Sequence, residues 1–150
     1  MGIAASRMLR ASQQFKRYYE GCFASLLEDE DLSIREIHVL LFLYNNPGRD
    51  TAREVSELRG MPKSQVSAAV DLLTERGFLK RQTDREDRRV VHLTLTASGR
   101  TLGREARKLQ TACVARVLSP LTETEREQFQ ALLEKILTGA ESKLWEGASQ

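Results

Sequence analysis

Apolar positions in the middle of the chain change period once, from that of a helix to that of a strand. From Val66 to Leu73 they recur at spacings of three and four, which predicts one buried face of a helix. Gly77 follows this run and predicts the helix end, because glycine readily adopts the left-handed conformation that closes a final turn. Between residues 91 and 95, apolar and polar side chains alternate, which predicts a strand.

A strongly charged segment separates the predicted helix from the predicted strand. Residues 76–89 contain six Lys or Arg and three Asp or Glu. So many charged side chains cannot all be buried, so we expect this segment to project into water as a hairpin. A helix followed by a basic hairpin is the outline of a winged helix.

Two capping-box patterns precede this unit. Ser33 with Glu36, and Thr51 with Glu54, each place a hydroxyl three residues before a glutamate, which predicts two helix starts. The second of these helices is short and ends near Leu58. Two short helices joined by a tight turn predict a helix-turn-helix arrangement, with the helix of Val66 as its second member.

Long amphipathic helices are predicted at both ends of the chain. One covers about residues 5–27 and is followed by an acidic connector at 28–31. The C-terminal end, at about residues 97–148, is predicted to form two helices. The first is capped by Thr96 and is broken by Pro120, and the second follows it to the end of this region.

The apolar stripe of that last helix extends to Ala140 and Leu144, and its start has a third capping box at Thr122. A small winged-helix core at about 33–99 cannot cover all of these stripes. We therefore expect a mainly α protein with a small β-wing, in one domain of 150 residues, that forms a two-fold homodimer through its terminal helices.

Composition and charge narrow the function. The net charge is only +2, but residues 33–118 hold 16 Lys or Arg against 10 Asp or Glu. No apolar run approaches the ~18 residues of a membrane helix, so we expect a cytoplasmic protein without a membrane partner. No phosphate-binding glycine loop, metal-ligand spacing or nucleophile beside a base is visible, so we expect no enzyme, cofactor or metal.

The ordered pattern resembles the MarR family of bacterial transcriptional regulators. The segments that carry the resemblance are Leu32-Ser33-x-x-Glu36 before Val39-Leu40, Lys63 to Ser67, Leu73-x-x-x-Gly77-Phe78-Leu79-x-Arg81, Asp84-x-x-Asp87-Arg88-Arg89, and Leu93-Thr94 through Gly99. The resemblance implies a repressor dimer on a palindromic double-stranded DNA operator, with helices in two major grooves and wings over the flanking minor grooves. It also implies a small-molecule or redox signal that alters DNA affinity.

The outer face of the helix-turn-helix supplies candidate base contacts. Its polar or small side chains are Lys63, Ser64, Gln65, Ser67 and Ala68. Hydroxyl, amide and ammonium groups suit base edges, and an alanine suits a thymine methyl, although a solvated helix face would have a similar composition.

Further candidate contacts lie at a helix start and in the wing. Thr51 and Arg53 begin a helix, where phosphate binding is favourable, although capping alone explains Thr51. In the wing the resemblance implies that Asp87 orients Arg89 toward the minor groove, with Arg85 and Arg88 on the backbone. A solvated charge run is the alternative.

The sequence gives less information about the small molecule or oxidant that the protein senses than about its DNA contacts. Tyr18, Tyr19, His38 and Phe42 are candidate lining residues of an effector pocket, although an aromatic stripe is equally typical of a core. Two cysteines, Cys22 and Cys113, lie in apolar stripes and form no disulfide framework, which favours small buried hydrophobes over a redox sensor. A winged-helix protein-interaction module without DNA binding remains an alternative function.

Overall fold

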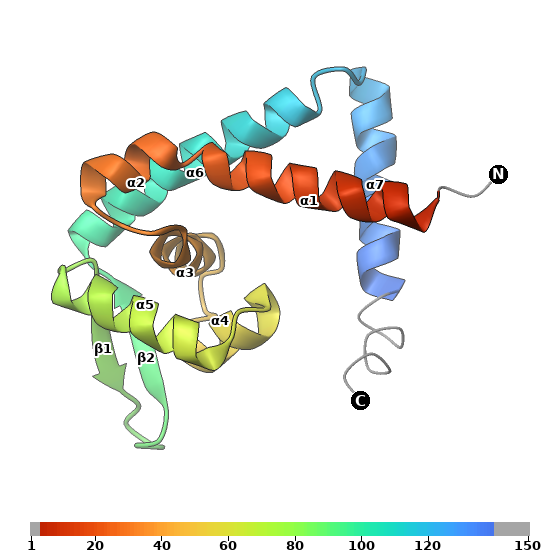
Figure 1. Ribbon diagram of the computed structural model, residues 1–150. Coiled ribbons are helices and arrows are strands. Elements are labelled where there is room, and N and C mark those ends of the chain that lie inside the picture. The colour runs from red at the N-terminus through yellow and green to blue at the C-terminus, as the bar shows by residue number, and fades with distance from the viewer. Residues whose placement is uncertain (1–3, 140–150) are drawn as a thin grey trace. The chain divides into compact units, whose positions relative to one another are not determined.

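The computed structural model describes residues 4–139, and within them it has seven helices and one two-stranded sheet (Figure 1). The elements in chain order are α1 (Ala5–Gly21), α2 (Ala24–Glu30), α3 (Ile34–Asn45), α4 (Ala52–Arg59), α5 (Lys63–Glu75), β1 (Leu79–Thr83), β2 (Val91–Leu95), α6 (Ala97–Val117) and α7 (Glu123–Gly139). By their contacts these residues form two compact units, the first ending at Cys113 and the second beginning at Val114. No helix within residues 4–139 is long and apolar enough to cross a membrane.

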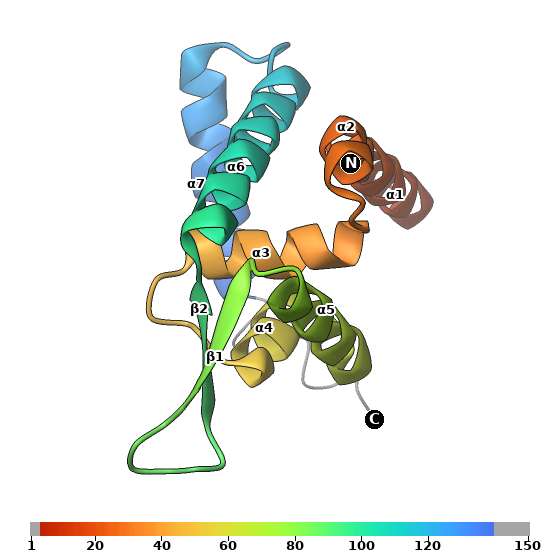
Figure 2. The same cartoon turned by 90° about the vertical axis from the view of Figure 1, so that its left-hand side faces the viewer.

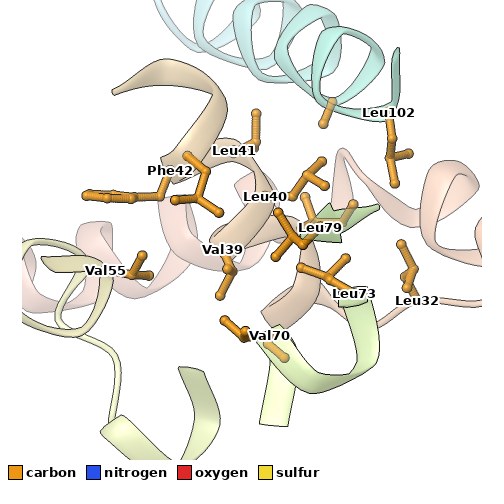
Figure 3. Packing of buried hydrophobic residues seen from close by; sticks show 14 of the residues in the cluster. Leu32, Val39, Leu40, Leu41, Phe42, Val55, Val70, Leu73, Leu79 and Leu102 are labelled. Atoms are coloured by element: carbon orange, nitrogen blue, oxygen red, sulfur yellow. The ribbon is translucent and has the colours of Figure 1, made fainter. Parts of the chain in front are cut away.

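Helix α3 lies at the centre of the first unit, with α4, α5 and β2 packed against it (Figure 2). Its start has the predicted capping box, in which the carboxylate of buried Glu36 accepts the Ser33 backbone N–H at 2.7 Å. The side chains of Val39 and Leu40 are fully buried and meet Leu73 of α5 in the hydrophobic core (Figure 3). Burial of this kind of side chain contributes about 1.5–3 kcal/mol each, so α3 fixes the position of α5.

The end of α5 and the start of the wing are fixed by one backbone motif. Gly77 has φ +76°, its N–H donates to the Thr74 carbonyl at 3.1 Å, and the Phe78 N–H donates to the Leu73 carbonyl at 2.8 Å. This is a Schellman motif, as the position of Gly77 predicted. The chain therefore leaves α5 directly into β1.

The wing is an antiparallel hairpin of β1 and β2, in which Gln82 is paired with His92. Leu79 and Leu93 are buried and anchor the hairpin to the core, while its far end extends beyond the helices (Figure 2). The strand predicted at residues 91–95 is confirmed. Val91, the first apolar residue of that alternation, is 37% exposed because it lies near the projecting end.

The prediction of one helix over residues 5–27 with an acidic connector at 28–31 was wrong. The helix ends at Gly21, and a second helix begins at Ala24 and runs through the acidic residues to Glu30. Phe23 lies at the break and is fully buried. Glycine destabilises a helix interior, and the break allows the Phe23 ring to enter the core.

The second unit contains the last residues of α6, a turn and α7. The turn includes Pro120, and α7 starts with the predicted capping box, in which the Thr122 N–H donates to Glu125 at 2.8 Å. Five large apolar side chains of α7 are 39% or more exposed: Phe129, Leu132, Leu133, Ile136 and Leu137. Ala140, Leu144 and the predicted continuation of this helix to residue 148 lie outside the described residues.

Candidate nucleic-acid interface

Helix α5 presents a polar face to solvent and an apolar face to the core. Val66, Ala69, Val70 and Leu73 are at most 3% exposed. The opposite side chains predicted as base contacts are exposed, and they are Lys63, Ser64, Ser67 and Ala68. Gln65, predicted with them, is only half-buried and lines a pocket.

The two candidates at the start of α4 already have partners within that helix. The Thr51 hydroxyl accepts the Glu54 backbone N–H at 3.2 Å and caps the helix. The Arg53 Nε donates to Glu57 at 2.8 Å, although the Arg53 side chain is 79% exposed. Arg53 therefore retains free guanidinium N–H groups for an anion, whereas the Thr51 hydroxyl is used for capping.

The carboxylate of Asp84 stabilises the turn at the tip of the wing. Asp84 Oδ1 accepts the backbone N–H groups of Glu86 and Asp87, at 2.8 and 2.9 Å. The Asp87 N–H is the largest cause that lowers the pKa of Asp84 to about 2, followed by the hydrogen bond from His92. Asp84 is therefore ionised at neutral pH and holds the turn that carries the wing arginines.

Asp87 and Arg89 form the ion pair that the resemblance implied. Arg89 donates from Nε to Asp87 Oδ1 at 3.1 Å and from a terminal nitrogen to Oδ2 at 3.3 Å. The contact with Arg89 lowers the pKa of Asp87, and the Arg89 side chain remains 90% exposed. The pair therefore restricts an arginine that projects into solvent. The side chains of Arg85 and Arg88 are also exposed and form no hydrogen bond or ion pair with residues 4–139.

Two cations near the wing have structural roles. Arg76 donates to the carbonyls of Glu30 and Asp31, at 2.6 and 3.3 Å, and joins the end of α5 to the end of α2. Arg81 forms an ion pair with Asp71 and joins β1 to α5. The positive charge that remains available on the wing therefore comes from the tip arginines and from exposed Lys80 of β1.

The sequence did not predict that His92 would bridge two carboxylates. Its Nδ1 lies 2.8 Å from Asp50 Oδ1, and its Nε2 lies 2.8 Å from Asp84 Oδ2. Asp50, then Asp84, raises the pKa of His92 above its ordinary value of 6.5. The alternation of apolar and polar residues predicted that His92 lies on the polar side of a strand. Its two partners are 42 and 8 residues away in the sequence, so the contacts can be recognised only in the folded structure.

A pocket of about 660 Å³ lies beside this interface in the first unit. Its lining includes the Phe15 and Tyr19 rings of α1, the cations Lys16, Arg35 and Arg59, and the polar side chains Glu20, His38, Gln65 and Gln110. Tyr19 accepts a hydrogen bond from Gln110 at 2.7 Å and stacks on His38, with ring centroids 6.3 Å apart. Phe42 lines a smaller adjoining cavity, whereas Tyr18, predicted with it, lines neither cavity and is 40% exposed.

His38 has an unusual environment in this pocket. Its Nε2 is buried and has no hydrogen-bond partner within residues 4–139. Burial, then Arg59 and Lys16, lowers the pKa of His38 to about 4. The imidazole is therefore neutral at pH 7, and its buried Nε2 has an unsatisfied hydrogen-bonding capacity within the described residues.

The two cysteines lie together, although they are far apart in sequence. Cys22 and Cys113 are both free, and Cys22 lies near enough to Cys113 to affect the pKa of its thiol. Burial, then Cys22, raises the pKa of Cys113 to about 11, so this thiol is protonated at pH 7. Within the described part of the chain, no cluster of three or more His, Cys, Asp or Glu side chains is arranged to hold a metal ion.

Comparison with known proteins gives one consistent family. The family model for the MarR family matches residues 30–90. The HTH-type transcriptional repressor Rv2887 of Mycobacterium tuberculosis is 30% identical over 105 residues, covering 70% of this chain and 75% of that protein. Its solved structure in complex with salicylic acid has a TM-score of 0.69 at 24% identity and covers 90% of this chain and 97% of that one.

Two further matches differ in how much they cover. The transcriptional repressor MprA of Escherichia coli K12 is 32% identical over 85 residues, covering 57% of this chain. The match covers 48% of MprA, so the chain spans about half the length of that relative. The structure of the Staphylococcus aureus MepR–DNA complex has a TM-score of 0.71 at 24% identity and covers 92% of this chain and 99% of that one.

Proposed function

Because the chain belongs to the MarR family of transcriptional regulators, we propose that it represses transcription by binding specific double-stranded DNA through α5 and the β1–β2 wing. MarR-family members are DNA-binding regulators and not enzymes, which agrees with the expectation from the sequence. The MepR–DNA complex provides the precedent for DNA binding by a protein of this fold.

The observation that carries this proposal is the combination of α5 with the wing tip. Helix α5 exposes Lys63, Ser64 and Ser67 at its beginning, and an α-helix fits the major groove, where such donors and acceptors distinguish base pairs. The wing tip holds Arg89 by a two-point ion pair and leaves it exposed. A restrained arginine is suited to a narrow minor groove, where the negative potential is enhanced.

The proposal is tested by selecting DNA from a random pool with the purified protein and measuring its affinity for the selected duplex at several salt concentrations. We expect tighter binding to the selected than to a scrambled duplex, and weakening as salt rises because counterions are released. Arg88→Ala should weaken binding to all sequences and lower the salt slope by about one unit. Absence of DNA binding at low salt would favour the alternative of a protein-interaction module.

We propose that the protein is a homodimer that binds a palindromic operator, and that the dimer forms through the terminal segments at about residues 5–27 and 97–148. The support is apolar surface that the described residues leave uncovered, notably Met8 and Leu9 on α1 and Ile136 on α7, each 61% or more exposed. Exposed apolar patches of this kind mark interaction surfaces. Light scattering should show a dimer, and Ile136→Glu should shift it toward a monomer, while the selected DNA should contain two inverted half-sites one turn apart.

The pocket beside α5 is the proposed site of a modulating ligand, and its chemistry fits a small aromatic anion. Tyr19 and Phe15 provide rings for stacking, Lys16, Arg35 and Arg59 provide positive charge, and neutral His38 has an unpartnered nitrogen. Gln65 belongs to both α5 and the pocket lining, so an occupied pocket can alter the position of α5. Salicylate, which is bound in the Rv2887 complex, is a suitable probe for calorimetry and for its effect on DNA affinity.

Two finer assignments complete the proposal. The protein acts in the cytoplasm, because a regulator of bacterial transcription must reach chromosomal DNA. A cysteine-based redox regulator is a second candidate, favoured by the proximity of Cys22 to Cys113. The protonated state of Cys113 weighs against it, because the thiolate is the reactive form.

A further inference from the structure

The wing is joined to the body of the first unit by a continuous chain of hydrogen bonds through His92. On the body side the imidazole contacts Asp50, which immediately precedes the N-cap of α4. On the wing side it contacts Asp84, which immediately follows β1. The Leu93 N–H also donates to the Asp50 carbonyl at 2.7 Å, so β2 and the loop before α4 are linked by backbone as well.

Asp84 extends this chain of hydrogen bonds to the wing tip. While Oδ2 contacts His92, Oδ1 accepts the Asp87 N–H, and the Asp87 carboxylate holds Arg89. The Asp84 N–H also donates to the Val90 carbonyl at 2.9 Å and closes the base of the tip. A contiguous network therefore runs from Asp50 to Arg89.

We propose that His92 is a positioning residue for DNA binding, and that its protonated form restrains the wing so that Arg89 is presented in one geometry. This inference rests on the proposed function, because it assigns a role in DNA binding. An imidazolium has two N–H donors, one for each carboxylate, whereas a neutral imidazole has a single donor. After deprotonation, one ring nitrogen faces a carboxylate oxygen with lone pairs on both sides, and one of the two links is lost.

The surroundings of His92 set the direction of this effect. The charged groups that contact it are Asp50 from the loop before α4 and Asp84 from the wing, and both favour the imidazolium. Since the pKa of His92 in the folded protein is raised, the restraint is present at low pH and is lost as pH rises through that pKa. DNA affinity should therefore fall with rising pH by more than it does in a variant without the imidazole.

The first arm of the test needs no DNA. The chain has two histidines, so the imidazole protons of tag-free protein give two titrating signals in an NMR experiment, and His92→Gln assigns them. We expect the His92 signal to titrate above pH 6.5 and to move toward this ordinary value in Asp50→Asn. A wild-type midpoint at or below 6.5 would overturn the proposal.

The second arm measures DNA affinity from pH 6 to 8.5 at constant ionic strength. Wild-type affinity should fall by about twofold to fivefold more than that of His92→Gln across this range, a size typical of an exposed ion pair. The same excess should be reduced in Asp50→Asn, which leaves the wing turn intact. Thr94→Gln, an exposed substitution two residues along the same strand, is the matched control and should keep the wild-type profile.

The outcomes separate this inference from the proposed function. If no duplex binds at any pH, the proposed function fails, while the NMR titration still reports the His92 bridge. If DNA binds with the same pH profile in wild type and His92→Gln, the positioning role of His92 is wrong and the proposed function stands. Thermal unfolding of each variant verifies that it is folded.

Discussion

The wing and the pocket each contain one of the two histidines, and their environments shift the two pKa values in opposite directions. His92 is in the wing, with a carboxylate at each ring nitrogen, and its pKa is raised. His38 is in the pocket, with a buried unpartnered Nε2 and two cations nearby, and its pKa is lowered to about 4. In the wing, His92 and its two carboxylates form hydrogen bonds with one another at the surface. In the pocket, His38 Nε2 is buried without a hydrogen-bond partner among the described residues.

This difference indicates different tasks for the two regions. A hydrogen-bond network in which every polar group has a partner restrains its side chains in one arrangement. Such a restraint suits a surface whose arginines contact the regularly spaced phosphates and grooves of DNA. A buried unsatisfied atom reduces stability, and such an atom is found in a native protein where a ligand or water completes it. The wing is therefore suited to holding a geometry, and the pocket to receiving a molecule.

The largest effect is expected from removal of the wing arginine. Arg89→Ala should lower affinity for the selected duplex by about tenfold or more, because a restrained groove contact is lost. Affinity of the pocket for salicylate, measured by calorimetry, should not change. Arg104→Ala, which removes one exposed arginine of α6, is the control for net charge. An equal loss in both variants would mean that the wing acts only through its overall charge.

Replacing His38 in the pocket should change the binding of salicylate and leave the binding of DNA unchanged, which is the reverse of the effect of Arg89→Ala. His38→Phe removes the unpartnered nitrogen and keeps a ring for stacking on Tyr19. We expect the free energy of unfolding to increase by about 1 kcal/mol, while salicylate affinity falls and DNA affinity without ligand is unchanged. Denaturant unfolding and calorimetry measure the two effects. A less stable variant that still binds salicylate with wild-type affinity would contradict the assignment of His38.

The pH dependence of the free energy of unfolding should contain a component that comes from His38 and can be distinguished from that of the other titrating groups. An unfolded histidine binds a proton near pH 6.5, but folded His38 does so only near pH 4. The unfolded state therefore binds more protons between these values, and stability falls as pH falls from 6.5 toward 4. This component should be absent from His38→Phe in chemical unfolding experiments at each pH. Identical pH profiles for wild type and variant would show that His38 is solvated.

The smallest effect is expected from oxidants. Because the Cys113 thiol is protonated at pH 7, treatment with hydrogen peroxide at moderate concentration should leave DNA affinity unchanged. Mass spectrometry should find both cysteines reduced. A peroxide-induced disulfide between Cys22 and Cys113, accompanied by loss of DNA binding, would instead establish the redox alternative.

Local patterns predicted the helix-turn-helix and the wing because short-range chemistry determines them. Capping boxes, the glycine at the end of α5 and the alternation in β2 each act within five residues, and each prediction agrees with the structure. The Asp87–Arg89 pair is likewise local, and the resemblance implied it.

Features that depend on distant residues were predicted less well. The break at Phe23 occurs because a core formed by other helices accepts that ring. The Asp50–His92 contact joins residues 42 apart, and Cys22 and Cys113, which lie near each other, are farther apart still in the sequence. Of the side chains predicted to line an effector pocket, Tyr19 and His38 line the larger cavity, whereas Tyr18 does not, because neighbouring helical residues lie on different faces.

The central claim is that α5 and the wing contact adjacent grooves of one DNA half-site. Hydroxyl-radical footprinting of the selected duplex tests it directly, by comparing wild-type protein with Arg89→Ala at concentrations that saturate each complex. The account predicts that both proteins protect the backbone around the major groove, while Arg89→Ala loses protection at the flanking minor groove alone. Loss of protection spread evenly over the site, or an unchanged footprint, would contradict it.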